Sequence, residues 1–134
     1  MATWLGFDFG TRRIGVAVGQ TITRTASPLG TLTAVRQRPD WARIAGLIDT
    51  WRPEGLVVGL PFNMDDTEAE VAARARRFAR QLEGRFRLPV HLVDERLTSL
   101  EAEHLLAAAG QRSGDVDAQA AKLILETWLS ETST

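Results

Sequence analysis

The most restrictive feature of this sequence is the apolar run Gly55–Leu60 (GLVVGL), which stands between two segments of helical periodicity. A run without polar alternation is typical of a strand that is buried on both faces of a sheet. A second apolar run, Val90–Val93, follows the second helical segment and is interpreted in the same way. Strand–helix–strand connections imply parallel pairing, so the chain is expected to build a sheet that helices cover.

The N-terminal part of the chain follows the strand period. Residues 4–10 and 14–19 are short apolar runs, and the polar turn 11–13 separates them. A third strand is predicted within Thr25–Ala34, with Pro28 near an edge or a bulge. These segments predict an antiparallel meander. Together with the two parallel strands, they predict a mixed five-stranded sheet flanked by helices.

Several segments place apolar residues at helical spacing: 41–52, 67–84, 98–110 and 115–129. Asp40 is predicted to cap the first helix, and Pro53 to end it. Capping boxes, Thr67–Glu70 and Thr98–Glu101, are predicted to open the second and third helices. We expect the second helix to end at Gly84.

Composition narrows the class of protein. A chain of 134 residues, 44% hydrophobic and 25% charged, is expected to form one globular domain over residues 1–134. It has no cysteine, no apolar run long enough to span a bilayer and no signal pattern, so a cytoplasmic protein is expected. The net charge of −1 counts against a strongly basic, non-specific nucleic-acid binder, although every basic residue except Lys122 is an arginine.

Asp8 lies in the stretch GFDFGTRRIGVAVG, which contains the D-F-G tripeptide that holds magnesium in protein kinases. A kinase is excluded because no H-R-D motif follows and because Lys122 is the only lysine. In a strand, Asp8 shares one face with Gly6 and Gly10, which leaves space for a ligand or metal beside a carboxylate that is costly to bury alone. A salt bridge to an arginine explains an isolated aspartate at least as well.

Two further acidic segments change that balance. Glu95 and Asp94 follow a predicted parallel strand, at whose carboxyl end ligands collect, and they point to opposite sides. Asp115 and Asp117 open the last helix, where an aspartate can simply favour the helix dipole. Carboxylates from three elements, without nearby histidine or cysteine, suit Mg²⁺ or Mn²⁺. Two such ions ~3.5–4 Å apart can activate water for phosphodiester hydrolysis.

Other polar segments have both a functional and an ordinary explanation. In the loop GLPFNMD, Asn63 and Asp65 either contact phosphate or metal, or form a turn. At the hairpin tip, Thr11, Arg12 and Arg13 either bind phosphates or solubilise a turn. The basic helix face, whose members are Arg74, Arg76, Arg77 and Arg80, is either a nucleic-acid track or, as is commoner, a solvated surface.

The motifs GFDFGTRRIGVAVG, VVGLPFNMDD, VDERLTS and DVDAQAAKLILETWL occur in this order and spacing. They resemble the YqgF family, also called RuvX, whose members are Holliday-junction-resolvase-like proteins described as pre-16S rRNA nucleases. The resemblance covers residues 4–129. It implies a ribonuclease H-like fold and a metal-dependent nuclease. One departure is Asp66, which stands where family members often have glycine after the loop aspartate.

Residue by residue, the resemblance implies that Asp8, Glu95 and Asp117 are the catalytic and metal-binding carboxylates. We hypothesise that Asp8 bridges two Mg²⁺ or Mn²⁺ ions, and that Arg12 and Arg96 hold the flanking phosphates. The remaining substrate-binding residues expected are Thr11, Asn63 and Asp65.

Alternatives remain open at this stage. Actin-like ATPases share the D-x-G-T hairpin, but they need two such domains to enclose a nucleotide. A non-catalytic RNA-binding or assembly module is a second rival. For a nuclease, structured RNA is favoured as substrate and branched DNA is the alternative. The chain could act as a monomer or a homodimer, and its near-neutral charge suggests a ribosomal partner that adds affinity.

Overall fold

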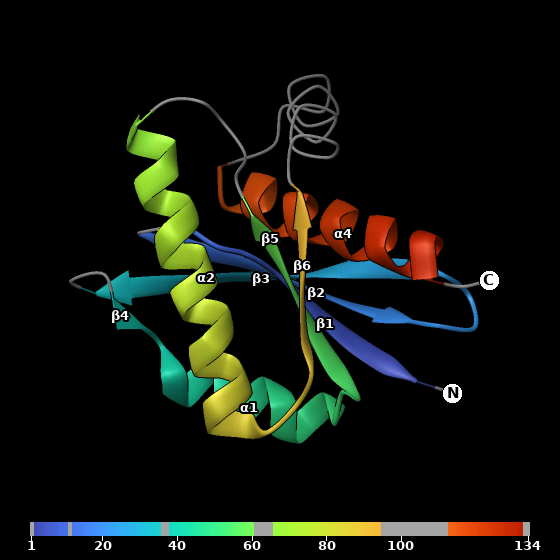
Figure 1. Ribbon diagram of the computed structural model, residues 1–134. Helices are drawn as coiled ribbons and strands as arrows, with labels where there is room; N and C mark the ends of the chain where they lie inside the picture. The colour runs from blue at the N-terminus through green and yellow to red at the C-terminus, as the bar shows by residue number, and fades with distance from the viewer. Residues whose placement is uncertain (1, 11, 36–37, 61–65, 95–112, 133–134) are drawn as a thin grey trace.

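The computed structural model describes residues 2–10, 12–35, 38–60, 66–94 and 113–132 (Figure 1). Its strands and helices, in chain order, are β1 (Thr3–Asp8), β2 (Arg13–Gln20), β3 (Thr25–Val35), β4 (Arg38–Pro39), α1 (Trp41–Trp51), β5 (Gly55–Leu60), α2 (Asp66–Phe86), β6 (Val90–Asp94) and α4 (Ser113–Thr132). The predicted helix over residues 98–110 lies outside the described residues.

The strands form one mixed sheet in the order β4-β3-β2-β1-β5-β6. The predicted meander is confirmed, because β1 and β3 both pair antiparallel with β2. The predicted parallel pairs are confirmed as well, since β5 lies between β1 and β6 and runs parallel to both. The expectation of five strands is wrong by one. The additional strand, β4, is only two residues long, which is too short for hydrophobic alternation to reveal it.

Pro28 lies beside an irregularity in the β2–β3 pairing, as predicted. Val16 pairs with Gly30, whereas the next residue, Ala17, pairs with Pro28, so the register shifts between these positions. A proline cannot donate a ladder hydrogen bond, and a bulge is one of the few places where a sheet tolerates it.

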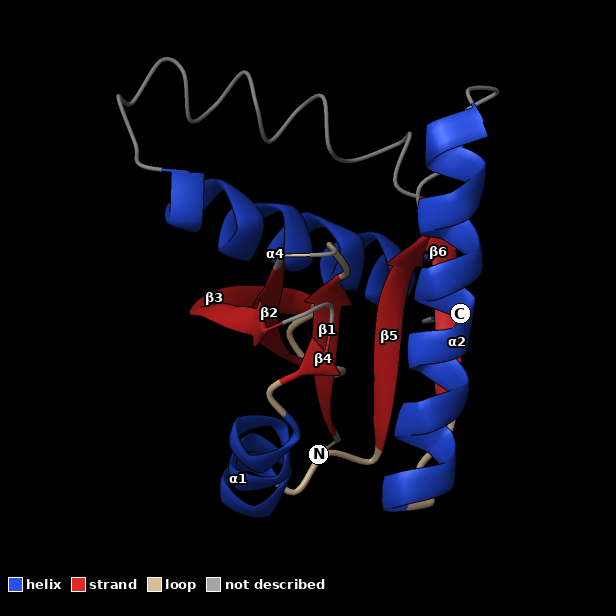
Figure 2. Ribbon diagram, turned by 90° about the vertical axis from the view of Figure 1, so that its left-hand side faces the viewer, coloured by secondary structure: helices blue, strands red, loops and turns tan. Residues whose placement is uncertain are grey.

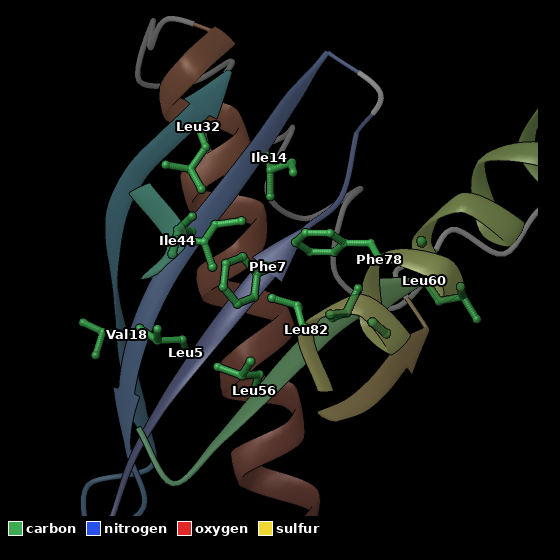
Figure 3. Packing of buried hydrophobic residues seen from close by; sticks show 14 of the residues in the cluster. Leu5, Phe7, Ile14, Val18, Leu32, Ile44, Leu56, Leu60, Phe78 and Leu82 are labelled. Atoms are coloured by element: carbon green, nitrogen blue, oxygen red, sulfur yellow. The ribbon is translucent and has the colours of Figure 1, made fainter. Parts of the chain in front are cut away.

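Helices cover both faces of the sheet (Figure 2). On one face, α1 and α2 bury Ile44, Phe78 and Leu82 against Leu5 and Phe7 of β1. Figure 3 shows these side chains pointing toward one another between the sheet and the two helices. A second cluster lies on the other face, where Ala121, Ile124 and Leu125 of α4 pack against Ala17 and Val57.

The first helix is confirmed at both ends. The Asp40 carboxylate accepts a hydrogen bond from the backbone N–H of Arg43, which makes Asp40 the N-cap. Arg52 takes a left-handed conformation and donates its N–H to the Ile48 carbonyl, immediately before Pro53. The Trp51 side chain, at the end of this helix, is 38% exposed.

Two predicted boundaries of α2 are wrong. The helix begins at Asp66, one residue before the expected cap Thr67. It also continues through Gly84 to Phe86 and ends where Arg87 adopts a positive φ of 55°. Gly84 has open space around it and no left-handed backbone, so its presence does not force the chain out of the helix.

Two further expectations need correction. The strand β6 is not buried on both faces, because it lies at the edge of the sheet, where His91 is exposed and Leu92 is 45% exposed. The last helix does not end at residue 129, as predicted, but continues to Thr132. Among the helices that the structure describes, none combines the length and apolar composition needed to cross a membrane.

Candidate functional site

The candidate site lies at the end of the sheet where the carboxyl ends of three parallel strands, β1, β5 and β6, come together. Asp8 is the last residue of β1 and pairs with Gly59 of β5, while Leu60 of β5 pairs with Asp94 of β6. This register brings the ends of all three strands to one level. In α/β sheets, ligands bind outside such carboxyl ends. The segments predicted to carry the chemistry therefore begin side by side.

The side chain of Asp8 belongs to the face of the sheet that α4 covers. A methyl group built on Gly6, two residues earlier, would come within 2.8 Å of Leu125 Cβ in α4. Phe7, between them, packs in the cluster on the opposite face. Because residues alternate along a strand, Asp8 shares the face of Gly6. The alternation deduced from sequence is confirmed, and Asp8 is half-buried there.

Gly15 brings the first turns of α4 against this face. It is the antiparallel partner of Asp8 on β2. A side chain at Gly15 would overlap the carbonyl group of Asp117 and would lie 3.0 Å from the Ala118 nitrogen. The helix backbone therefore rests directly on the strand. Neighbouring strands lie about 4.8 Å apart. The backbone of Asp117, which rests on β2, therefore lies about one strand spacing from Asp8 on β1.

Asp117 forms an ion pair with Arg13, which lies in the hairpin that follows Asp8. Its Oδ2 atom lies 3.1 Å from Arg13 Nε, and the Asp117 side chain is 22% exposed. The same oxygen is buried and has no hydrogen-bond partner among the described residues, so the Arg13 contact is charge proximity rather than a well-aligned hydrogen bond. Burial raises the pKa of the Asp117 carboxyl, and Arg13 partly opposes that rise.

The other predicted site residues are less defined. Arg12 is exposed at the start of the hairpin, and its backbone carbonyl accepts a hydrogen bond from the Ala34 N–H. The predicted residues Thr11, Asn63, Asp65, Glu95 and Arg96 lie outside the described residues. Of the proposed acidic set, the structure thus brings together Asp8 and Asp117.

Sequence reasoning missed the pairing of Arg13 with Asp117. It treated Arg13 only as a member of a basic hairpin tip, because an ion pair between residues this far apart in the chain leaves no local pattern. Gly15 lies within the motif GFDFGTRRIGVAVG, but the motif alone gives no physical reason for a glycine at this position. The close approach of the Asp117 backbone supplies that reason.

The donor chemistry at this edge fits a hard divalent cation. Asp8 and Asp117 offer carboxylate oxygens, and one oxygen of Asp117 is desolvated without a hydrogen-bond donor from the described residues. Within that part of the chain, no three acidic or histidine side chains gather in one place. A complete shell for two ions therefore requires a carboxylate such as Glu95 from beyond it.

The aromatic side chains outside this edge have structural roles. The His91 ring stacks on Trp128 at 5.1 Å, and Trp4 lies 4.2 Å from Trp128, which forms a cluster between β1, β6 and α4. Trp41 packs against Phe78 at 5.6 Å on the other face. Trp4, Trp41 and Trp128 therefore pack against the core clusters, whereas Trp51 is exposed.

Comparisons with known proteins agree with this arrangement. The model of a family described as "RuvX: Holliday junction resolvase" matches residues 2–131. A relative from Azotobacter vinelandii, named "Putative pre-16S rRNA nuclease", is 57% identical over 131 residues, which are 95% of this chain and 92% of that protein.

Two solved structures share the fold. RuvC of T. thermophilus, in complex with a Holliday junction substrate, matches with a TM-score of 0.63 at 17% identity, over 99% of this chain and 98% of that one. The Fowlpox virus resolvase, in complex with Holliday junction DNA, matches with a TM-score of 0.57 at 8% identity, over 98% of this chain and 99% of that one. The mixed α/β, ribonuclease H-like fold is therefore confirmed.

Proposed function

This chain belongs to the RuvX family of Holliday junction resolvases, and from that premise we propose that it is a metal-dependent nuclease that processes the 5′ end of pre-16S rRNA. The observation that supports the proposal is the close approach of the Asp117 backbone to Gly15, which is the strand partner of Asp8 at the carboxyl end of β1. The name of the 57% identical relative supports ribosomal RNA as the substrate.

We propose Asp8, Glu95 and Asp117 as the residues that hold Mg²⁺ or Mn²⁺. Glu95 lies outside the described residues, and its assignment rests on the resemblance of the motif VDERLTS to the family. Two divalent ions bound there would neutralise developing charge and activate a water for hydrolysis of the phosphodiester bond.

The protein's own residues have two further tasks in this proposal. Asp117, which is partly desolvated by burial, is held in place by Arg13. Arg12 is exposed one residue before Arg13 and is proposed to bind a flanking phosphate, since guanidinium groups match phosphate oxygens in pairs. The remaining residues proposed to contact substrate are Thr11, Asn63, Asp65 and Arg96.

The wider setting of this activity is also a proposal. We treat residues 1–134 as one nuclease domain that binds nucleic acid, with structured RNA favoured over branched DNA. A ribosomal RNA substrate places the protein in the cytoplasm. Acting on one RNA strand requires no second copy, whereas symmetric cleavage of a junction would require a dimer.

The decisive experiment compares two labelled substrates, a 5′-extended 16S rRNA precursor and a four-way DNA junction. Each is incubated with purified protein and Mn²⁺, Mg²⁺ or EDTA, beside Asp8→Asn. The matched control is Asp49→Asn, which makes the same change at an exposed position of α1. We expect metal-dependent cleavage of the RNA that Asp8→Asn abolishes and Asp49→Asn retains.

Other outcomes would revise the proposal in defined ways. Symmetric cutting of the junction alone would assign the protein to DNA recombination. Folded protein that binds RNA but cuts neither substrate with any metal would contradict the catalytic proposal and favour a binding or assembly module.

A further inference from the structure

Three arginines give the outer face of α2 a concentrated positive charge. Arg76, Arg77 and Arg80 are exposed, and within the described part of the chain none of them forms an ion pair. By contrast, Arg74 on the same helix binds Glu70 at 3.0 Å. We call the three unpaired residues the arginine face. Arg76 and Arg80 stand one helical turn apart, where like charges disfavour the helix slightly, so helix stability does not explain them.

Packing places the arginine face at the level of the candidate site. Phe78, which lies among these residues in sequence, packs its ring 5.6 Å from Phe7 and 5.2 Å from Phe9. Those two residues flank Asp8, so this part of α2 crosses the sheet at the height of Asp8. Because α2 buries Phe78 toward the sheet, the exposed arginines lie on the opposite side of the helix.

The helix also extends past the end of the sheet. Figures 1 and 2 show the N-terminal turns of α2 projecting beyond the carboxyl end of β6. At 1.5 Å per residue, the 21 residues of α2 span about 30 Å, whereas the 5 residues of β6 span about 16 Å. A polymer bound at the carboxyl ends of the strands would therefore pass around these ends to reach the outside of α2.

The separation between the two places sets a length for the ligand. A helix packs with its axis about 10 Å from its neighbour and has a radius of about 5 Å, so the arginine face lies on the order of 20 Å from Asp8. At about 3.4 Å per phosphate, roughly six nucleotides would bridge that distance. A mononucleotide or a short fragment at the site would not reach the arginine face.

We propose that the arginine face binds the phosphate backbone of the RNA strand outside the cleavage site. This inference rests on the proposed nuclease function and deepens it. Guanidinium groups bind phosphates through paired hydrogen bonds, and contacts to the backbone position a substrate without reading its sequence. A protein with a net charge of −1 can bind RNA in this way, because the three arginines lie together on one helix and create a local positive potential.

The test measures binding separately from cleavage. The triple variant R76Q/R77Q/R80Q is compared with the unaltered face, both in the Asp8→Asn chain, so that the RNA stays intact. The probe is a fluorescein-labelled RNA hairpin with a single-stranded 5′ extension of about 12 nucleotides, twice the bridging length estimated from the phosphate spacing. Fluorescence anisotropy gives the Kd between about 50 and 200 mM salt, where phosphate contacts dominate.

A matched control separates a local contact from a change in total charge. The triple variant R24Q/R43Q/R52Q removes the same charge from exposed arginines in the β2–β3 turn and on α1. We expect the arginine-face variant to bind about tenfold more weakly, and its salt dependence to lose about 0.7 per phosphate, or about 2 in total. The control variant should keep the salt dependence of the parent chain.

A shortened probe adds a second readout. With a 5′ extension cut to about 3 nucleotides, half the bridging length, both parent and arginine-face variant should bind with the same Kd. Equal affinity and equal salt slope on the long probe would overturn the inference, as would an equal loss in the control variant. Failure of the proposed function would look different, because the wild-type chain would then cut no RNA with any metal.

Discussion

At the scale of single residues, the ion pair between Arg13 and Asp117 determines much of the electrostatics of the candidate site. A buried carboxylate oxygen that lacks a hydrogen-bond donor from the described residues is costly to ionise, and burial accordingly raises the pKa of Asp117. Arg13 offsets part of that cost from 3.1 Å away. The site thus keeps a poorly solvated anion, which is what a cation-binding position requires.

The stability of the metal-free protein should reveal this cost. Burial raises the folded-state pKa of Asp117 above its ordinary value of 3.8, so ionisation of Asp117 destabilises the fold at neutral pH. As pH falls through the raised pKa, the native state takes up the proton first and the penalty disappears. We expect Asp117→Asn to raise Tm in EDTA at neutral pH, and this gain to shrink toward pH 3.8.

Thermal unfolding followed by circular dichroism gives the Tm values that test this prediction. The control is Asp49→Asn, which makes the same change at an exposed position. A lower Tm for Asp117→Asn at neutral pH would show that the attraction of Arg13 outweighs the burial cost. The variant should lose metal-dependent cleavage in either case, because the amide is a neutral ligand.

Arg13 and Arg12 form a matched pair for a second prediction. Arg13 holds the Asp117 carboxylate, so a divalent cation must compete with it, whereas Arg12 is a neighbouring exposed residue. A partly exposed ion pair is worth about 1 kcal/mol, so Arg13→Gln should tighten Mn²⁺ binding by a factor of about five. Arg12→Gln should change the affinity less. Isothermal titration of Mn²⁺ without substrate compares them, and weaker binding by Arg13→Gln would refute this role.

At the scale of elements, the docking of α4 on the sheet depends on small residues in β1 and β2. Gly6 leaves room for Leu125, and Gly15 leaves room for the backbone of Asp117. A strand normally avoids glycine, since it adds no side chain to the core. Here the absent side chains allow the helix to approach closely, and that approach carries Asp117 to the site.

Gly15→Ala should therefore push the start of α4 away from the sheet. The new methyl group would overlap a backbone carbonyl, which cannot rotate aside, and overpacking of this kind costs about 1–3 kcal/mol or more. The control is Gly46→Ala in α1, where nothing lies within 4 Å of the added atom. That change should stabilise the protein by about 0.5–1 kcal/mol.

Urea denaturation measures both variants, and cleavage assays show whether Gly15→Ala also loses activity. A stable and fully active Gly15→Ala protein would mean that α4 does not position Asp117 for the reaction.

At the scale of the whole molecule, the proposed metal site would be built from segments that are far apart in the sequence. Binding of a cation to the native state alone should stabilise the entire fold. At a concentration of 100 times Kd, the gain is about 2.7 kcal/mol. We expect Mn²⁺ to raise Tm for the wild-type chain and to leave Asp8→Asn almost unchanged. A similar rise in both proteins, measured against EDTA, would place the cation elsewhere.

Much of the fold could be predicted because its signals are local. The GLVVGL run, the meander and the Asp40 cap are patterns within a few residues, and each was found in the structure. Errors arose where local patterns were weak or ambiguous. The strand β4 is too short to show a period, and Gly84 resembles a helix end but lies within α2.

The edge position of β6 shows a different kind of limit. Its apolar residues suggested burial on both faces, yet Leu92 is 45% exposed. An apolar run does not show whether another strand pairs beside it in the sheet. Burial of a strand depends on neighbours from elsewhere in the chain, and these are absent from any local pattern.

By itself, the sequence determined that Asp8 shares a face of β1 with Gly6, because strand alternation is a property of the backbone. Only the tertiary structure decided that the Asp117 backbone lies against Gly15, the strand partner of Asp8, and that Arg13 pairs with the Asp117 carboxylate. The physical reason is that these contacts depend on how closely α4 packs on β2, at a distance of about a hundred residues along the chain. That approach is set by two glycines and by the core beneath the helix, whose combined effect appears only when the chain is folded.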